Sequence, residues 1–340
     1  MTHRTVLRST FAFIVMSFLS ATAQAGLFRS YISSTGNDAN PCTLPQPCRL
    51  LPAALTAVND GGEIWMLDSA NYNTGPVNIT KSVTILAVPG VLGSVLANGG
   101  NAIDIATVGV KVALRNLVIV PFSGGGGANG INMTNGAALT VEGCLFSNLP
   151  GTGIIVSTAA EARVTDTTIR DNVGGGLALQ NGASATVSRA TISGNGGSGG
   201  AGVYADGSVA GTATSADIAD STIDGGFNGV FAYSTNATAV VRVSVRDSRV
   251  YRNTGDGVGA RSDAGASVIV SASNNMISKN GIGIRSLYAG SSVLAVGNTI
   301  SDNAYGFRNT SGLLKSAGNN AVSNNTVADS SGTITPIASM

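Results

Sequence analysis

The chain has 340 residues, a formal net charge of +1, only 11% charged residues and 46 glycines. Without the two arginines of its first 25 residues, 17 basic residues stand against 18 acidic ones, so no strongly basic field is present to attract nucleic acid or anionic membranes. So few charges mean that Ser, Thr, Asn and Gly must cover the surface, which is unlike a cytosolic enzyme.

Residues 1–25 have the pattern of a secretory signal peptide. Arg4 and Arg8 give a positive start, residues 11–19 are mostly apolar, and residues 23–25 form a small-x-small cleavage site. The apolar stretch is too short for a transmembrane helix, although an uncleaved N-terminal anchor is the alternative. We expect a bacterial exported protein, secreted or periplasmic, with no integral membrane segment after cleavage. The only histidine, His3, lies in this segment, so the mature chain has none.

Residues 26–62 are expected to form an N-terminal loop and a short helix. Cys42 and Cys48 lie close together in sequence, and in an exported protein such a pair favours a local disulfide. Residues 49–58 place Leu51, Leu55 and Val58 on one face, with Pro52 in the first turn, which predicts an amphipathic helix ended by residues 59–62. The third cysteine, Cys144, has no histidine to pair with and is expected to be a packed small residue rather than a nucleophile.

From residue 130 onward the chain repeats one short pattern eight times. Each repeat opens with a glycine and an apolar residue, and these glycines are spaced 23, 23, 26, 27, 28, 26 and 23 residues apart. Apolar residues alternate over short runs, which is the period of a strand, and no helical period extends over ten residues. Self-similarity at this period is the signature of a solenoid. We therefore predict an all-β fold, a single-stranded right-handed parallel β-helix of about ten coils over residues 63–325, followed by a C-terminal tail at 326–340.

Equivalent positions of successive coils lie about 4.8 Å apart, so like residues are expected to form ladders. An inward apolar ladder is predicted at Phe146, Ile169, Ile192, Ile223, Val250, Ile277, Ile300 and Val322. A polar ladder at the bend before it is predicted at Asp166, Asp220, Asp247, Asn274, Asn298 and Asn319, and an asparagine ladder after it at Asn172, Asn195, Asn253, Asn280, Asn303 and Asn325. We interpret these Asn and Asp residues as structural, because their side chains can satisfy backbone groups at turns. Since an open solenoid end exposes core and strand edges, the helix at 49–58 is the candidate cap.

The motif from Tyr31 to Cys48 with its following helix, the segment from Gly62 to Ile85 and the repeats from Gly130 onward resemble bacterial exported right-handed parallel β-helix repeat proteins of the pectin-lyase-like superfamily. The resemblance covers nearly the whole mature chain. It implies extracellular polysaccharides as partners, because that superfamily includes pectate and pectin lyases, polygalacturonases, chondroitinases and phage tailspikes, together with adhesins that catalyse nothing. Fold alone does not choose among these functions.

The strand after each repeat glycine has two predicted outward-facing positions. The first set is Asn132, Ile155, Ala178, Tyr204, Phe231, Gly259, Arg285 and Arg308, and the second is Thr134, Ser157, Gln180, Asp206, Tyr233, Arg261, Leu287 and Thr310. The later coils therefore gather aromatic rings and arginines on one face. Rings stack on sugars and arginines hold carboxylates in bidentate fashion, so we predict carbohydrate binding by Tyr204, Phe231, Tyr233, Arg285 and Arg308. The alternative is an ordinary surface on which arginines stack on rings.

The sequence favours a scaffold over an enzyme. A glycoside hydrolase needs two carboxyl groups flanking the scissile bond, yet no Asp-Asp pair and no usable histidine is present. A polysaccharide lyase would need carboxylates around Ca²⁺ and an Arg or Lys as base. Its weak candidates are Arg261, Arg285, Arg308, Asp206, Asp256 and Asp263. We predict a carbohydrate-associated or surface interaction scaffold that needs no cofactor, partnered by a polysaccharide or cell-surface glycan. A Ca²⁺-dependent lyase acting on an acidic glycan by β-elimination is the alternative, and a structural protein or adhesin is the third class.

Overall fold

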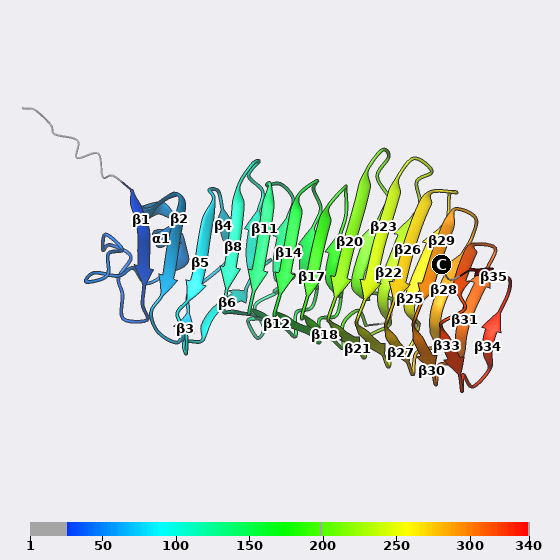
Figure 1. The fold of residues 1–340 in the computed structure, drawn as a ribbon. Helices are drawn as coiled ribbons and strands as arrows, with labels where there is room; N and C mark the ends of the chain where they lie inside the picture. The colour runs from blue at the N-terminus through cyan, green and yellow to red at the C-terminus, as the bar shows by residue number, and fades with distance from the viewer. Residues whose placement is uncertain (1–25, 198, 339–340) are drawn as a thin grey trace, which may run out of the picture.

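The strands stack into one elongated right-handed solenoid that runs from the N-terminal to the C-terminal end of the chain (Figure 1). The computed structural model describes residues 26–197 and 199–338, and the predicted signal peptide lies outside them. Within these residues the strands form three parallel sheets of 13, 11 and 11 strands, with about ten coils in all. The predicted fold class is confirmed.

Sheet one contains β1 (Leu27–Ile32), β2 (Val58–Met66), β5 (Val83–Ala87), β8 (Lys111–Arg115), β11 (Ala138–Glu142), β14 (Glu161–Thr165), β17 (Ser184–Ser188), β20 (Ala213–Ala219), β23 (Val240–Arg246), β26 (Ser267–Ser273), β29 (Ser291–Val296), β32 (Leu313–Ala317) and β35 (Ile334–Ile337). Sheet two contains β4 (Val77–Ile79), β7 (Ile103–Ile105), β10 (Ile131–Met133), β13 (Thr152–Val156), β16 (Gly175–Leu179), β19 (Ala201–Asp206), β22 (Asn228–Ser234), β25 (Asp256–Ser262), β28 (Ile282–Leu287), β31 (Tyr305–Thr310) and β34 (Ala328–Ser331). Sheet three contains β3 (Ala70–Asn71), β6 (Gly93–Ala97), β9 (Leu117–Pro121), β12 (Leu145–Ser147), β15 (Thr168–Arg170), β18 (Thr191–Ser193), β21 (Thr222–Asp224), β24 (Arg249–Tyr251), β27 (Met276–Ser278), β30 (Thr299–Ser301) and β33 (Ala321–Ser323).

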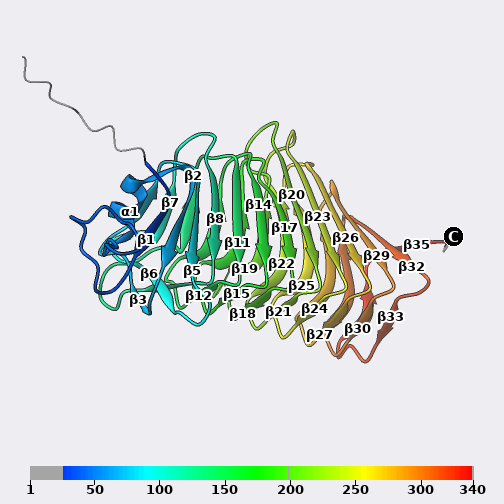
Figure 2. The same cartoon turned by 60° about the vertical axis from the view of Figure 1, so that its left-hand side comes forward.

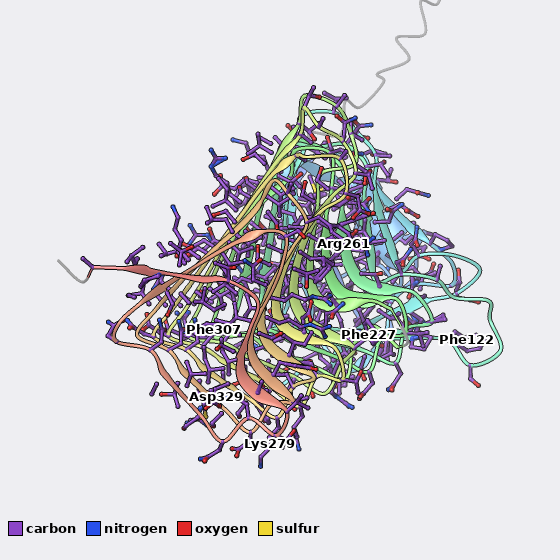
Figure 3. The ribbon with its side chains drawn as sticks, turned by 90° about the vertical axis from the view of Figure 1, so that its right-hand side faces the viewer. Phe122, Phe227, Arg261, Lys279, Phe307 and Asp329 are labelled. Carbon is purple, nitrogen blue, oxygen red and sulfur yellow. A yellow bond between two sulfur atoms is a disulfide. The ribbon has the colours of Figure 1, made fainter. Side chains whose placement is uncertain are left out.

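The predicted apolar ladder runs through sheet three without a break. Phe146 pairs with Ile169, and the register continues coil by coil to Val322. All members are buried except Val322, which is half-buried in the last coil. Seen down the solenoid, the sheets enclose a single core (Figure 3). Because each rung buries its side chain against the rungs above and below, the repeat period fixes the core.

The predicted asparagine ladder is a buried hydrogen-bond chain. Asn253 donates its backbone N–H and Nδ2 to Asn280 Oδ1 at 3.0 and 2.9 Å, and Asn280 donates to Asn303 Oδ1 in the same way. Asn303 in turn donates to Asn325 Oδ1. Each side chain thus supplies the acceptor that the turn of the preceding coil needs. These residues are structural, as the repeat pattern indicated.

The predicted ladder at the preceding bend is correct for five of its six members and wrong for Asn298. Left-handed backbone, which Asp and Asn tolerate better than most residues, occurs at Asp166, Asp220, Asp247 and Asn274. Asn298 does not belong to this ladder, because Gly297 occupies the left-handed position of that coil with φ of 64°. Instead, Asn298 Oδ1 accepts from Asn275 at 3.0 Å, one position further along. Asn319 accepts from the Gly297 N–H at 2.9 Å and so keeps its predicted place.

The helix α1 (Leu51–Ala57) packs across the N-terminal end of the solenoid, as its predicted role as a cap requires (Figure 2). It buries Leu51, Ala54 and Leu55. The helix is shorter than the predicted 49–58, because Leu50 and Val58 have extended backbone. Val58 is buried as the first residue of β2, and residues 59–62 form a bulge in that strand rather than a helix-ending turn.

The cysteines have the predicted arrangement. Cys42 and Cys48 form a disulfide that closes a loop beside β1. Cys144 is a buried free thiol whose backbone N–H donates to Thr167 Oγ1, the equivalent position of the next coil. Burial raises the pKa of the Cys144 thiol to about 12, so it is not a nucleophile at neutral pH.

The sheets extend beyond the predicted solenoid range of 63–325 at both ends. β1 and the start of β2 precede residue 63, while β34 and β35 lie in the segment predicted to be a tail. The difference arises because these strands lack the repeat glycine pattern yet still find a backbone partner in the neighbouring coil. No helix of the described ranges is both long and apolar enough to cross a bilayer.

Candidate functional site

The outward-facing positions of sheet two gather the aromatic residues in one place. The register sets Tyr204 beside Phe231 and Asp206 beside Tyr233 on the neighbouring strands β19 and β22. The Tyr204 and Phe231 rings are stacked, 6.5 Å apart and nearly parallel at 5°. The Tyr233 ring lies 6.4 and 6.5 Å from the other two. The three rings therefore form a continuous aromatic surface, here called the aromatic cluster.

Burial raises the pKa of Tyr204, and the nearby Asp206 carboxylate acts in the same direction, so the Tyr204 hydroxyl stays neutral over the whole physiological range.

Arg261 and Asp263 fix the edge of the aromatic cluster. Arg261 Nε and Nη2 donate to the two carboxylate oxygens of Asp263 at 2.7 and 2.8 Å, and the Tyr233 hydroxyl donates to Asp263 Oδ2 at 2.8 Å. The Arg261 guanidinium also lies 5.3 Å from the centre of the Tyr233 ring. The hydrogen bonds from Arg261 hold the pKa of Asp263 below its usual range. These contacts fix the Tyr233 ring, Arg261 and Asp263 relative to one another.

The aromatic cluster and Arg261 border a groove of about 460 Å³. Its other lining residues come mainly from β13, β16 and the turns before β16 and β19, and most of them are small: Thr152, Ile155, Gly174, Gly175, Leu177, Ala178, Gln180, Gly199, Gly200, Ala201 and Asn228. Figure 3 labels Arg261 and Phe227 on the same flank of the solenoid. A hollow of about 410 Å³ on sheet one is lined by Ser and Thr side chains, by the charged Glu161, Asp217 and Arg242 and by a few apolar residues, and has no ring in its lining. Of these two hollows, the groove on sheet two is the one that combines aromatic rings with polar groups.

A second group of charges lies further along sheet two. Arg285 and Arg308 are neighbours in register on β28 and β31, and Gly259 on β25 precedes Arg285. The Asp256 carboxylate is buried beside them, with Oδ2 2.7 Å from Arg285 Nη2. Burial raises the pKa of Asp256 to about 6, against the opposing effect of the two arginines.

A family model described as "Right handed beta helix region" matches residues 91–215. The structure has the right-handed β-helix fold that this model describes, and its sheets extend beyond the matched residues on both sides. No curated protein matches the sequence at a significant level.

Three solved structures are similar to this β-helix. A pectate lyase is 16% identical with a TM-score of 0.52, covering 78% of this chain and 77% of its own. A rhamnogalacturonan lyase is 12% identical with a TM-score of 0.51, covering 90% and 84%. The Dettilon tailspike protein is 13% identical with a TM-score of 0.56, covering 84% and 63%. At these identities the likeness concerns the fold.

The structure separates the predicted site residues of the β-helix into two groups. Tyr204, Phe231 and Tyr233 lie together at the groove with Arg261, Asp206 and Asp263, whereas Arg285 and Arg308 lie together with Asp256. The three aspartates do not converge, and no group of three His, Cys, Asp or Glu able to hold a metal ion occurs in residues 26–197 and 199–338. Asp263 is already hydrogen-bonded to Arg261, and Asp256 is buried.

Sequence reasoning missed the floor of the groove. Gly174, Gly199 and Gly200 lie in turns whose lengths vary between repeats, and Gly175 begins β16 directly after such a turn, so a count along the strands does not place them. The signal that was available is the unusual density of glycine before the strand that begins at residue 201.

Proposed function

We propose that this protein is an exported carbohydrate-binding β-helix, in which the groove beside the aromatic cluster receives an oligosaccharide. The observation that carries the proposal is the aromatic cluster of Tyr204, Phe231 and Tyr233 beside a groove of about 460 Å³. Apolar faces of sugar rings stack on aromatic rings, while hydroxyl groups need the polar rim that Gln180, Asn228 and Arg261 supply.

Two further observations support the proposal. The solved structures with this fold include a pectate lyase, a rhamnogalacturonan lyase and a phage tailspike, and the first two act on polysaccharides by their names. The Cys42–Cys48 disulfide is typical of an oxidising compartment and agrees with the signal peptide predicted at residues 1–25. Both features support the proposal that the protein acts outside the cytoplasm.

The test is glycan binding by the chain that begins at Gly26, measured on a glycan array and then by calorimetry. Tyr204→Ala and Tyr233→Ala should each lower affinity by roughly 3- to 10-fold, since an aromatic contact contributes about 0.5–1.5 kcal/mol. Tyr251→Ala is the matched control, because Tyr251 lies on sheet three and stacks against Arg252. Unchanged affinity in both groove variants would refute the groove as the binding site.

The alternative proposal is a lyase. The adjacent Arg285 and Arg308 favour it, because an arginine near a carboxylated sugar is the group that would remove its proton. The described residues do not fit the Ca²⁺ that this alternative needs, because Asp206, Asp256 and Asp263 do not converge on one point. The measurement is ultraviolet absorbance of unsaturated products from acidic polysaccharides, with Ca²⁺ and with a chelator. Turnover that disappears with the chelator and in Arg285→Ala would favour the lyase. Binding without turnover would favour the scaffold. If neither binding nor turnover is observed, a structural or protein-binding solenoid is the remaining explanation.

A further inference from the structure

The Asp256 carboxylate occupies a space on the outer side of sheet two that a side chain would otherwise fill. Asp256 is only 1% exposed, although it is the first residue of β25, a strand that carries outward-facing side chains. Gly259 faces outward on the same strand, and a Cβ at that position would lie 2.6 Å from Asp256 Oδ2 and 2.7 Å from a carbon of the Phe231 ring. The absence of a side chain at residue 259 is therefore what allows the carboxylate to be covered there.

The ion pair that Asp256 makes is incomplete. Arg285 Nη2 approaches Asp256 Oδ2 to 2.7 Å without hydrogen-bond geometry, and both Asp256 Oδ2 and Arg285 Nε are buried without a hydrogen-bond partner. A buried carboxylate is normally satisfied by several donors, because burial removes its water. The pair holds Arg285 down against the sheet, yet neither group is fully satisfied by the other.

Arg308 stands next to this pair and forms no ion pair of its own within the described residues. It is the register neighbour of Arg285 on the adjacent strand, which places the two backbones about 4.8 Å apart. Its guanidinium lies 4.8 Å from the centre of the Tyr305 ring, and no salt bridge to a carboxylate is found for it in the described part of the chain. Two arginines at this spacing can hold one anionic group between them.

We propose that Arg285 and Arg308 form a subsite for an anionic group of a bound glycan, a carboxylate or a sulfate ester, and that Asp256 closes this subsite by holding Arg285 until Asp256 is protonated. The proposal rests on the proposed function and adds to it the chemical class of the glycan and the condition for its binding. Protonation removes the negative charge that retains Arg285, and the guanidinium then turns outward to join Arg308.

The charged groups that act on Asp256 are both arginines, and both lower the pKa of its carboxyl group. Arg285 on β28 and Arg308 on β31 are the charged groups that act on the carboxylate, and Asn228 on β22 accepts the Asp256 backbone N–H at 2.9 Å. The arginines favour the ionised carboxylate and burial favours the protonated one, and burial prevails, so that the pKa of Asp256 is about 6. Sugar carboxylates and sulfate esters stay ionised well below that pH. Only the protein then changes charge between pH 7.5 and 5.

The experiment measures affinity by calorimetry at pH 5.0, 6.0 and 7.5 with three probes: tetragalacturonate, its methyl ester and a sulfated carrageenan tetrasaccharide. The wild-type protein should bind at least one of the two anionic probes about tenfold more tightly at pH 5.0 than at pH 7.5, and the neutral ester without pH dependence. Which anionic probe responds decides between carboxylate and sulfate. Asp256→Asn should bind that probe at the acid level throughout. Asp224→Asn alters another largely buried aspartate paired with an arginine, Arg252 on sheet three, and should keep the wild-type pH dependence.

A wild-type affinity that is flat with pH, or an unchanged slope in Asp256→Asn, would overturn the inference. An equal pH response for the neutral ester would overturn it as well. If none of the probes binds, the proposed function fails for these glycans, and nuclear magnetic resonance of the free protein decides the inference separately. An Asp256 carboxyl titration near pH 6 with a concurrent shift of the Arg285 Nε resonance supports the release of Arg285. The absence of either change refutes it.

Discussion

Replacing the buried Asn280 of the asparagine ladder by alanine should destabilise the solenoid far more than replacing Asn325 at the end of the ladder. Asn280 is 4% exposed; its Oδ1 accepts two hydrogen bonds from Asn253, and its Nδ2 donates to Val250 O at 3.1 Å and to Asn303 Oδ1 at 3.0 Å. In Asn280→Ala, Asn303 Oδ1 keeps the backbone N–H of residue 280, whereas the backbone N–H of Asn253 loses its acceptor and Val250 O loses a donor.

Each buried polar group left without its partner costs about 1–3 kcal/mol, so we expect Asn280→Ala to lower the free energy of unfolding by about 3–4 kcal/mol. Asn325→Ala removes the same acceptor from Asn303, but Asn325 lies in the partly exposed last coils, where water can replace it. We expect a loss of about 1 kcal/mol there.

The measurement is urea unfolding followed by far-ultraviolet circular dichroism, with the slope of the transition checked for each variant, because a repeat protein can lose cooperativity. Equal losses in the two variants, or a loss below about 1 kcal/mol for Asn280→Ala, would show that the ladder does not stabilise the stack in the way argued.

Three further predictions concern the site and the N-terminal end. Because the pKa of Asp256 is raised to about 6, the folded state binds more protons than the unfolded state between about pH 4 and 6. The contribution of Asp256 to the free energy of unfolding should therefore fall by roughly 3 kcal/mol as pH rises through that window and be constant above it. Urea unfolding of Asp256→Asn should lack this fall. Gly259→Ala places a Cβ 2.6 Å from the Asp256 carboxylate and should lower the free energy of unfolding by about 1–3 kcal/mol, whereas Gly75→Ala meets no atom within 4 Å and should change it little; similar values for both would contradict the steric argument. Replacing Cys42 and Cys48 by Ser should lower the free energy of unfolding by about 2 kcal/mol, as expected for a short closed loop, and a variant as stable as the wild type would show that the disulfide is dispensable.

The sequence predicted the ladders of the solenoid well because the coils stack in register. Once the repeat glycines are aligned, any residue at a fixed distance from them must lie above its counterpart in the coil before, as Phe146 lies beside Ile169 and Tyr204 beside Phe231. The same reasoning placed Arg285 beside Arg308. Repetition thus converts position in the chain into position in space.

The misassignment of Asn298 shows where this reasoning stops. The turns between strands vary in length, so that a shift of one position in a turn moves a residue from one ladder to the next, and Gly297 took the place expected for Asn298. Part of the groove lining has the same origin, because Gly174, Gly199 and Gly200 lie in the turns before β16 and β19. Turn length is visible in the sequence, but the way in which successive turns lie over one another is not.

By itself the sequence determined the fold class, the apolar core and the outward face of sheet two, since all three depend on periods of two residues and of one coil. Only the tertiary structure decided which polar groups are free and which are covered. Asp256 begins β25 of sheet two yet is buried. Gly259 leaves space for its carboxylate, and Phe231 and Arg285 from the neighbouring coils cover that space. Such burial depends on the sizes of side chains in three successive coils at once, and no pattern along a single strand carries that information.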